Sequence, residues 1–229
     1  MQWYNNSSME IFVSSPKVSI IPSLLTNDYE ELQKLVELSS TVDRIHIDII
    51  DGSFADNKTI FPVAMKLIET KSKIDYHLMV DEPFTWLHAC EKADRIIAQV
   101  EMMKVSQSEF LSDATQYAIN TGLAVDLDTP ITKLDNEIFP KVDVILVMSV
   151  KAGFGGQKFE VSALEKVKQL KRIKDENGYR YQICVDGGIT TDNVKRVVEA
   201  GADEVVVGRR LFDGNMEENI KKYLEAAYV

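Results

Sequence analysis

The sequence predicts an α/β protein, a single (β/α)8 TIM barrel with eight parallel strands as its core. Two observations support this prediction. Eight short apolar stretches rich in β-branched residues recur along the 229 residues, and amphipathic helix-like segments lie between them. Alternating strands and helices are typical of a parallel sheet. Eight repeats favour a closed barrel over an open flavodoxin-like sheet, which would use five strands and leave three unexplained.

The predicted strands are short and apolar enough for a buried sheet. The run VDVILVMSV at residues 142–150 is almost continuously hydrophobic, which suits a strand that is covered on both faces. In chain order, strands are predicted at residues 18–21, 44–50, 74–80, 95–100, 123–127, 142–150, 181–185 and 204–207.

Helical segments with recognisable ends separate these strands. Asn27 or Asp28 can cap the first predicted helix at its N-terminus, and Gly178 and Gly201 follow predicted helix ends. The amphipathic segments lie at residues 27–40, 83–93, 108–120, 161–178 and 190–201.

The composition is that of an acidic globular chain. Hydrophobic residues make up 45%, and 36 Asp and Glu against 26 Lys and Arg give a net charge of −10, which argues against nucleic acid or an anionic membrane as partner. No apolar run is long enough to span a membrane, and Cys90 and Cys184 form no CxxC pair, so we expect a cytoplasmic location. Residues 1–16 lack a signal-peptide pattern, and we expect an N-terminal extension there and a barrel domain over residues 17–229.

Polar side chains end several predicted strands, where the active sites of such barrels lie. The period of two places His46 and Asp48 on one face of the second strand, and His77, Asp186 and Ser23 come at the ends of the third, seventh and first strands. Unpaired charges in a barrel interior are unfavourable. Two histidines and two aspartates that converge there therefore indicate a site for a divalent metal such as zinc, manganese or iron.

Glycine clusters follow the last three predicted strands. They are AGFGGQKF at residues 152–159, Gly187 with Gly188, and GRRLF at residues 208–212. Glycine lets backbone N–H groups approach an anion, and a barrel of this type commonly binds phosphate after its seventh and eighth strands, at a short extra helix. Residues 209–212 are predicted to be that helix.

Six motifs then show a close similarity to a known family. They are IIPSLLTNDYEEL, HIDIIDGSFADNKTIFP, HLMVDEP, VMSVKAGFGGQKF, VDGGI and VVVGRRLF, which run from about residue 18 to about residue 212. The chain resembles the ribulose-phosphate 3-epimerases in the order and spacing of these motifs. The resemblance implies a barrel enzyme that interconverts D-ribulose 5-phosphate and D-xylulose 5-phosphate. It also implies a homo-oligomer, either a dimer or a hexamer.

The resemblance further implies roles for individual residues. Asp48 and Asp186 would be the catalytic acid/base pair. One divalent metal, with zinc preferred over manganese or iron, would be held by His46, Asp48, His77 and Asp186. The substrate would contact Ser23, Met79 and Met148. Its phosphate would be bound by Gly153, Phe154, Gly155, Gly156, Gly187, Gly188, Gly208 and Arg209.

These residue types suit the chemistry of epimerisation. Inverting a carbon beside a ketone removes a proton from one face and returns one to the other, which calls for two acid/base groups. The enediolate intermediate carries negative charge, which a metal ion can stabilise as a Lewis acid. Backbone amides at the far end of the site would hold the phosphate and so place the reacting carbon.

The chain also departs from the family's pattern. Gln99 stands where the fourth strand usually ends in a histidine, Asp126 and Asp128 occupy a loop that usually reads LNPxTP, Ala152 replaces a proline, and Arg209 follows Gly208 in place of serine or threonine. We expect the two aspartates to add acidic groups near the mouth of the barrel. Arg209 can either bind phosphate or face solvent.

The departures leave three alternatives open. The substrate could be a ketohexose 6-phosphate such as D-allulose 6-phosphate. The chain could be a synthase or decarboxylase on the same barrel, for which we expect a lysine beside the strand-end aspartates. It could also be a catalytically decayed sensor of sugar phosphates.

Overall fold

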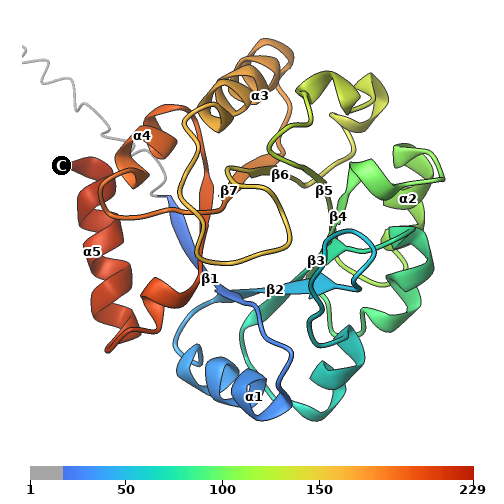
Figure 1. The fold of residues 1–229 in the computed structure, drawn as a ribbon. Helices are drawn as coiled ribbons and strands as arrows, with labels where there is room; N and C mark the ends of the chain where they lie inside the picture. Colours follow the sequence, from blue (N-terminus) through green and yellow to red (C-terminus); the bar gives the residue numbers. More distant parts are fainter. Residues whose placement is uncertain (1–17) are drawn as a thin grey trace, which may run out of the picture.

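Eight parallel strands form a closed barrel in the computed structural model, which describes residues 18–229 (Figure 1). Each strand pairs with the next one along the chain, and β8 pairs with β1 to complete the barrel. The predicted (β/α)8 barrel is therefore confirmed. The extension predicted at residues 1–16 lies outside the described residues.

The strands lie close to their predicted positions. The predicted fifth strand differs most, because it begins three residues earlier, where Asn120 pairs with Arg95 of the fourth strand. The bounds are β1 (Ser19–Leu24), β2 (Arg44–Ile50), β3 (Lys73–Met79), β4 (Arg95–Gln99), β5 (Asn120–Val125), β6 (Val144–Met148), β7 (Gln182–Asp186) and β8 (Glu204–Val207).

Five α-helices cover part of the barrel. They are α1 (Tyr29–Leu38), α2 (Gln107–Ala114), α3 (Ala163–Asn177), α4 (Val194–Glu199) and α5 (Met216–Tyr228). Asp28 caps α1 by accepting a hydrogen bond from the backbone N–H of Glu31, and Gly178 ends α3 with a positive φ of 68°. Both predicted helix ends are confirmed.

Elsewhere the outer layer is made of short 3-10 turns. The segment predicted as a helix over residues 83–93 forms η2 (Pro83–Ala89), and a similar turn, η1 (Pro62–Leu67), follows β2. Both begin with proline and have only six or seven residues. The remaining turns are η3 (Val100–Met102), η4 (Ile131–Lys133), η5 (Asn136–Ile138) and η6 (Arg209–Leu211).

Apolar side chains pack in two layers. One layer joins the outside of the barrel to the helices, and the other fills the barrel below its carboxyl end. Cys184, Met79 and Met148 belong to the inner layer and are buried. Cys184 is thus a core residue of the barrel interior.

Charged side chains cross the opposite end of the barrel interior. Arg95 of β4 reaches Glu204 of β8 through a 2.8 Å ion pair and also pairs with Asp75 of β3. Asp75 is fully buried and pairs with Arg44 as well. We name Asp75, Arg95 and Glu204 the lower charged layer. This layer was not predictable from the sequence, because its members come from three strands and meet only after the barrel closes.

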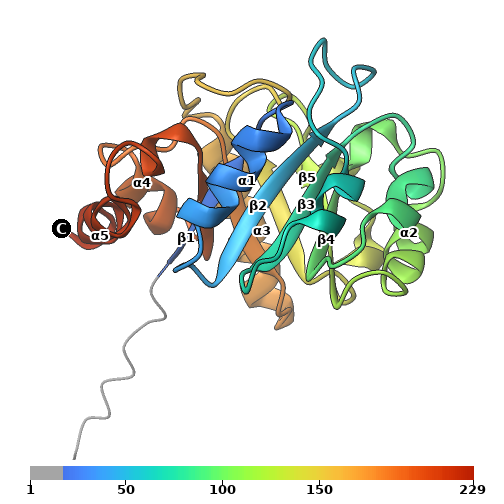
Figure 2. The same cartoon turned by 90° about the horizontal axis from the view of Figure 1, so that it is seen from below.

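The long connections project from one end of the barrel. Figure 2 shows the loops after β2 and β6 above the strands, whereas β1 begins at the other end. Within residues 18–229, no helix combines the length and the apolar run that crossing a membrane would need.

Candidate active site

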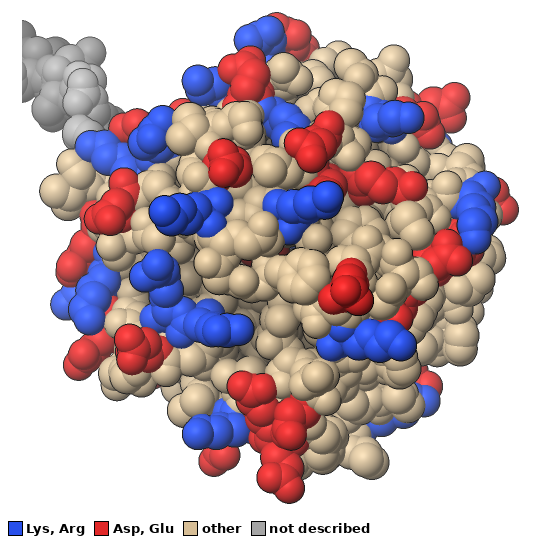
Figure 3. Space-filling view, in the orientation of Figure 1, with Lys and Arg blue, Asp and Glu red and all other residues tan. Residues whose placement is uncertain are grey.

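The carboxyl ends of the strands surround a cavity of about 970 Å³. Figure 3 views the molecule from this end, where Lys, Arg, Asp and Glu side chains surround a centre of other residues. Ser23, Met79 and Met148 line the cavity, together with Asp48 and Asp186. All the predicted substrate contacts therefore face one space.

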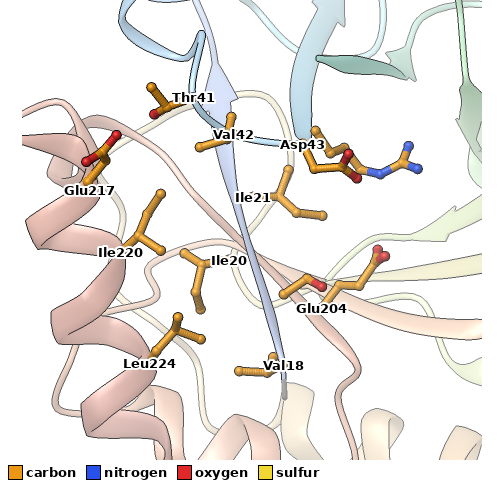
Figure 4. Close-up of a pocket in the computed structure, with 12 residues that line it drawn as sticks. Val18, Ile20, Ile21, Thr41, Val42, Asp43, Glu204, Glu217, Ile220 and Leu224 are labelled. Carbon is orange, nitrogen blue, oxygen red and sulfur yellow. The ribbon is translucent and has the colours of Figure 1, made fainter. Parts of the chain in front are cut away.

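A second cavity, of about 550 Å³, lies at the other end of the barrel. It is a cleft between β1 and α5, where Ile20, Ile220 and Leu224 lie together (Figure 4). The charged residues that line it are Asp43, Arg44, Glu204 and Glu217. The cluster of predicted metal ligands lies at the first cavity, so we place the candidate active site there.

Four predicted ligands converge at the base of the first cavity. His46, Asp48, His77 and Asp186 each offer one ligand atom, and these atoms lie within 4.8 Å of one another. The strand register explains this, because Asp48 of β2 pairs with His77 of β3 and the period of two puts His46 on the same face as Asp48. The four side chains thus lie together as the strand pattern predicts.

The Asp48 carboxylate contacts both histidines of this cluster and Ser23. Its Oδ1 lies 3.0 Å from Nδ1 of His77 and 3.5 Å from Nε2 of His46. Its Oδ2 accepts a hydrogen bond of 2.6 Å from the Ser23 hydroxyl. The Asp48 carboxylate is therefore held in one orientation from three sides.

The two carboxyl groups have opposite pKa shifts. Burial and, after it, the charge of Asp48 raise the pKa of Asp186 to about 7. Burial acts in the same direction on Asp48, but His46 and His77 outweigh it and hold the pKa of Asp48 well below its usual value. Two carboxyl groups whose environments separate their pKa values are suited to act as an acid and a base.

His46 is buried without hydrogen bonds. Neither of its ring nitrogens has a hydrogen-bond partner among the described residues. Burial alone would lower the pKa of His46, but the carboxylates of Asp48 and Asp75 raise it to about 10. Nδ1 lies 3.9 Å from Oδ2 of Asp75 in the lower charged layer, so Nε2 is the nitrogen that faces the cluster.

The predicted glycine-rich segments line the upper part of the cavity. A Cβ atom at Gly187 would lie 2.5 Å from Cγ2 of Val150, and one at Gly188 would lie 2.4 Å from the backbone nitrogen of Phe159, so these positions require glycine. All the predicted phosphate ligands belong to the lining, namely Gly153, Phe154, Gly155, Gly156, Gly187, Gly188, Gly208 and Arg209.

The short helix predicted after the eighth strand is present as η6, and Arg209 is exposed at its start. The cavity also receives Lys58 and Lys158, both from loops. Among the described lining residues, these are the only lysines, so the lysine expected for a synthase or decarboxylase does not stand on a strand between Asp48 and Asp186.

The loop after β6 is fastened from two sides. The carboxylate of Asp126 accepts a 2.8 Å hydrogen bond from the backbone N–H of Ala152, and the Asn57 amide donates a 2.8 Å hydrogen bond to the carbonyl of Gly153. We name Asp126 and Asn57 the loop clamp. Asp126 and Asp128 do not line the cavity in the described part of the chain. Asp126 therefore has a supporting role, and the expectation that it and Asp128 add acidic groups near the mouth of the barrel stays a prediction.

Sequence reasoning did not find the loop clamp, although one signal pointed to it. Alanine at position 152 carries the backbone N–H that the proline usual in the family lacks, and Asp126 supplies an acceptor for that N–H. Lys166 of α3 adds support by donating hydrogen bonds to the carbonyls of Asp126 and Leu127 at 2.6 and 2.8 Å.

Comparisons with solved structures show the same fold at low identity. A structure of KGPDC from Streptococcus mutans has a TM-score of 0.61 and 14% identity, and the match covers 92% of this chain and 97% of that one. A structure of 3-hexulose-6-phosphate synthase has a TM-score of 0.58 and 15% identity, with 91% and 99% covered. These similarities concern the fold alone.

Sequence comparisons are more specific. The ribulose-phosphate 3-epimerase of Synechocystis sp. is 33% identical over 219 residues, which cover 93% of this chain and 92% of the relative. The ribulose-phosphate 3-epimerase of Bacillus subtilis is 32% identical, with 85% and 92% covered. A sequence model described as the ribulose-phosphate 3 epimerase family matches residues 19–212. The chain therefore belongs to the ribulose-phosphate 3-epimerase family, whose members are isomerases acting on carbohydrates.

Proposed function

We propose that the protein is a metal-dependent 3-epimerase of a phosphorylated ketose, and that it interconverts D-ribulose 5-phosphate and D-xylulose 5-phosphate. The pair of Asp48 and Asp186 carries this proposal, because two carboxyl groups with opposite pKa shifts lie in one cluster with two histidines. The names of the relatives in Synechocystis sp. and Bacillus subtilis support the same substrate.

The donor set fits a divalent cation. Two imidazoles and two carboxylates suit zinc, manganese or iron, and we propose zinc. The buried Nε2 of His46, which has no hydrogen-bond partner among residues 18–229, supports the fit because it lies 3.5 Å from Oδ1 of Asp48. His46, Asp48, His77 and Asp186 would hold the ion, which would supply positive charge to stabilise the enediolate.

Asp48 and Asp186 would move the protons. They stand on β2 and β7, which are three strands apart around the closed barrel, so their carboxyl groups reach the cavity from different sides. The ionised Asp48 would accept the C3 proton on one face, with its orientation fixed by Ser23. Asp186, whose pKa is about 7, would return a proton to the other face. The two residues would exchange roles in the reverse direction.

The remaining predicted residues would position the substrate. The backbone amides near Gly153–Gly156, Gly187–Gly188 and Gly208 would bind the phosphate, and the exposed Arg209 would add positive charge. Met79 and Met148 would contact the sugar from the base of the cavity. The loop clamp would keep the loop after β6 in place over the substrate.

One experiment separates this function from its alternatives. The purified protein is incubated in D₂O with Zn²⁺ and D-ribulose 5-phosphate, and exchange at C3 together with formation of D-xylulose 5-phosphate is followed by NMR. D-allulose 6-phosphate is tested in parallel, and every assay is repeated with Mn²⁺ and Fe²⁺. Exchange with the pentulose supports the proposal. Exchange with the hexulose alone would assign the second substrate, and no exchange with either would favour the sensor.

We further propose a homo-oligomeric assembly, a dimer or a hexamer, and a cytoplasmic location. Light scattering of the full chain would test the assembly, and a monomeric mass would contradict it. Residues 1–16 are proposed to be an extension outside the barrel domain. A variant that begins at residue 17 should keep its epimerase activity if the domain boundary is correct.

A further inference from the structure

Gln99 has a buried side-chain amide in which only the nitrogen has a hydrogen-bond partner among the described residues. It ends β4 and has no exposed surface. Its side-chain nitrogen lies 3.1 Å from Nε2 of His77, whereas its side-chain oxygen has no hydrogen-bond partner among the described residues. A buried carbonyl oxygen without a partner is unfavourable. The arrangement therefore points to a second state in which this oxygen is used.

The contacts of His77 define the first state. The Asp48 carboxylate also accepts a hydrogen bond from Ser23, and a carboxylate only accepts hydrogen bonds, so the 3.0 Å contact fits a His77 ring with its proton on Nδ1. Nε2 is then unprotonated and accepts from the Gln99 amide. If Nε2 of His77 carried the proton instead, two hydrogen-bond donors, Nε2–H and the Gln99 amide N–H, would face each other. We therefore infer the Nδ1–H tautomer of His77 from its two contacts.

The same tautomer cannot ligate a cation through Nδ1. Nδ1 faces the cluster of four ligands, whereas Nε2 faces away from it toward Gln99. A histidine ligand must present an unprotonated nitrogen, and its other N–H usually donates to a nearby acceptor. When a cation binds, one proton must leave Nδ1 and one must be taken up at Nε2, so the charge of the ring does not change.

We propose that Gln99 is a positioning residue that serves both tautomers of His77. In the metal-free protein its amide N–H donates to Nε2. With a cation bound, a half-turn of the amide group brings the unpartnered oxygen to Nε2, where it accepts the new N–H. Gln99 does not line the cavity formed by the described residues, so it acts through His77 and not on the substrate. This inference rests on the metal site of the proposed function.

Two variants separate the donor role of Gln99 from its acceptor role. Gln99→Met keeps the length of the side chain but removes the amide, and Gln99→Glu keeps an acceptor but no donor when ionised. Zn²⁺ affinity of the full chain is measured by competition with a chromogenic chelator. Gln99→Met should bind Zn²⁺ about 10- to 100-fold more weakly, which is the usual effect of losing such a partner. Gln99→Glu should bind at least as tightly as the wild type. Gln182→Met, at the exposed start of β7, is the matched control and should not change the affinity.

The tautomer itself gives a readout that is independent of activity. ¹⁵N NMR of the His77 ring should show the proton on Nδ1 in the metal-free protein and on Nε2 after addition of Zn²⁺. The same tautomer in both states, or equal affinity in wild type and Gln99→Met, would overturn the inference and leave the metal site standing. A wild-type protein that binds no Zn²⁺, Mn²⁺ or Fe²⁺ would overturn the metal site as well. Thermal unfolding of the metal-free variants shows whether each is folded.

Discussion

The two ends of the barrel interior bury charge in different ways. At the amino end, Asp75 is paired with Arg44 and Arg95. His46 together with these two arginines holds the pKa of Asp75 at about 2, although burial alone would raise it. At the carboxyl end, Asp186 forms no ion pair within residues 18–229, and burial and the charge of Asp48 raise its pKa to about 7 although His46 opposes the rise. Paired charge is what a stable interior requires, whereas unpaired titratable groups concentrate at functional sites. This difference supports a functional site at the carboxyl end of the barrel.

Replacing Asp186 with asparagine should have the largest effect of the changes considered. Removal of one acid/base group is expected to lower the turnover number by about 10²–10⁴-fold. The metal-free variant should be at least as stable as the wild type, because the buried group no longer has to carry charge. Initial rates with D-ribulose 5-phosphate and urea unfolding measure the two effects. Full turnover would show that the two-carboxylate mechanism is wrong.

Breaking the lower charged layer should give the opposite result. In Arg95→Met, Asp75 and Glu204 lose their shared partner, and the loss of one member of a buried pair typically lowers the free energy of unfolding by about 3–5 kcal/mol. The variant that remains folded should keep its turnover number. Urea unfolding at pH 7, with assays below the transition, provides the measurement, and a stability equal to that of the wild type would contradict the prediction.

The same layer predicts how stability depends on pH. Since the pKa of folded Asp75 is about 2, below its usual value, its stabilising contribution is complete above about pH 4 and is lost as the pH falls through 2. The difference in free energy of unfolding between the wild type and Arg95→Met should therefore become smaller as the pH is lowered from 5 to 2. A constant difference over this range would exclude Asp75 as the source.

Removing the metal ion should lower the thermal stability of the wild-type protein. If Zn²⁺ binds only the folded state, an excess of about 1,000 times its Kd stabilises the protein by about 4 kcal/mol. A chelator should thus lower the Tm of the wild type, and Zn²⁺ should restore it. His46→Ala serves as the control and should show a much smaller shift. An unchanged wild-type Tm would contradict metal binding in the cluster.

A smaller effect is expected from the loop clamp. Asp126→Ala removes a hydrogen bond to a charged acceptor, which is worth about 1.5–3 kcal/mol. The KM for the sugar phosphate should rise about 10-fold or more, while kcat changes less, because the loop and not the acid/base pair is disturbed. Asp128→Ala, one turn away and exposed, is the matched control. Equal kinetics for both variants would show that the clamp does not position the loop.

The strand pattern was sufficient to predict the metal cluster. His46 and Asp48 are two residues apart on one strand, and His77 and Asp186 end other strands, so parallel pairing alone brings them to one end of the barrel. Contacts across the interior were not predictable in this way. Arg95 meets Glu204 on the strand opposite its own, which depends on how the barrel closes.

Local geometry also limited the prediction of elements and supports. The segment after Pro83 is amphipathic, yet it is short and forms a 3-10 turn where an α-helix was expected. Asp126 seemed from its charge to belong to the mouth of the barrel, but its hydrogen bond to Ala152 gives it a structural use. The composition of a loop does not reveal which of its polar groups the backbone of another loop will occupy.

Gly153 has a consequence for altering the substrate range. A Cβ atom at this position would lie 2.4 Å from the Cβ of Ala55, so the loops after β2 and β6 touch above the barrel. Their shapes are therefore interdependent: a bulkier residue on one loop displaces the other. Libraries that aim to admit a longer sugar should therefore keep Gly153, because its φ of 111° disfavours any side chain there whatever residue stands at position 55.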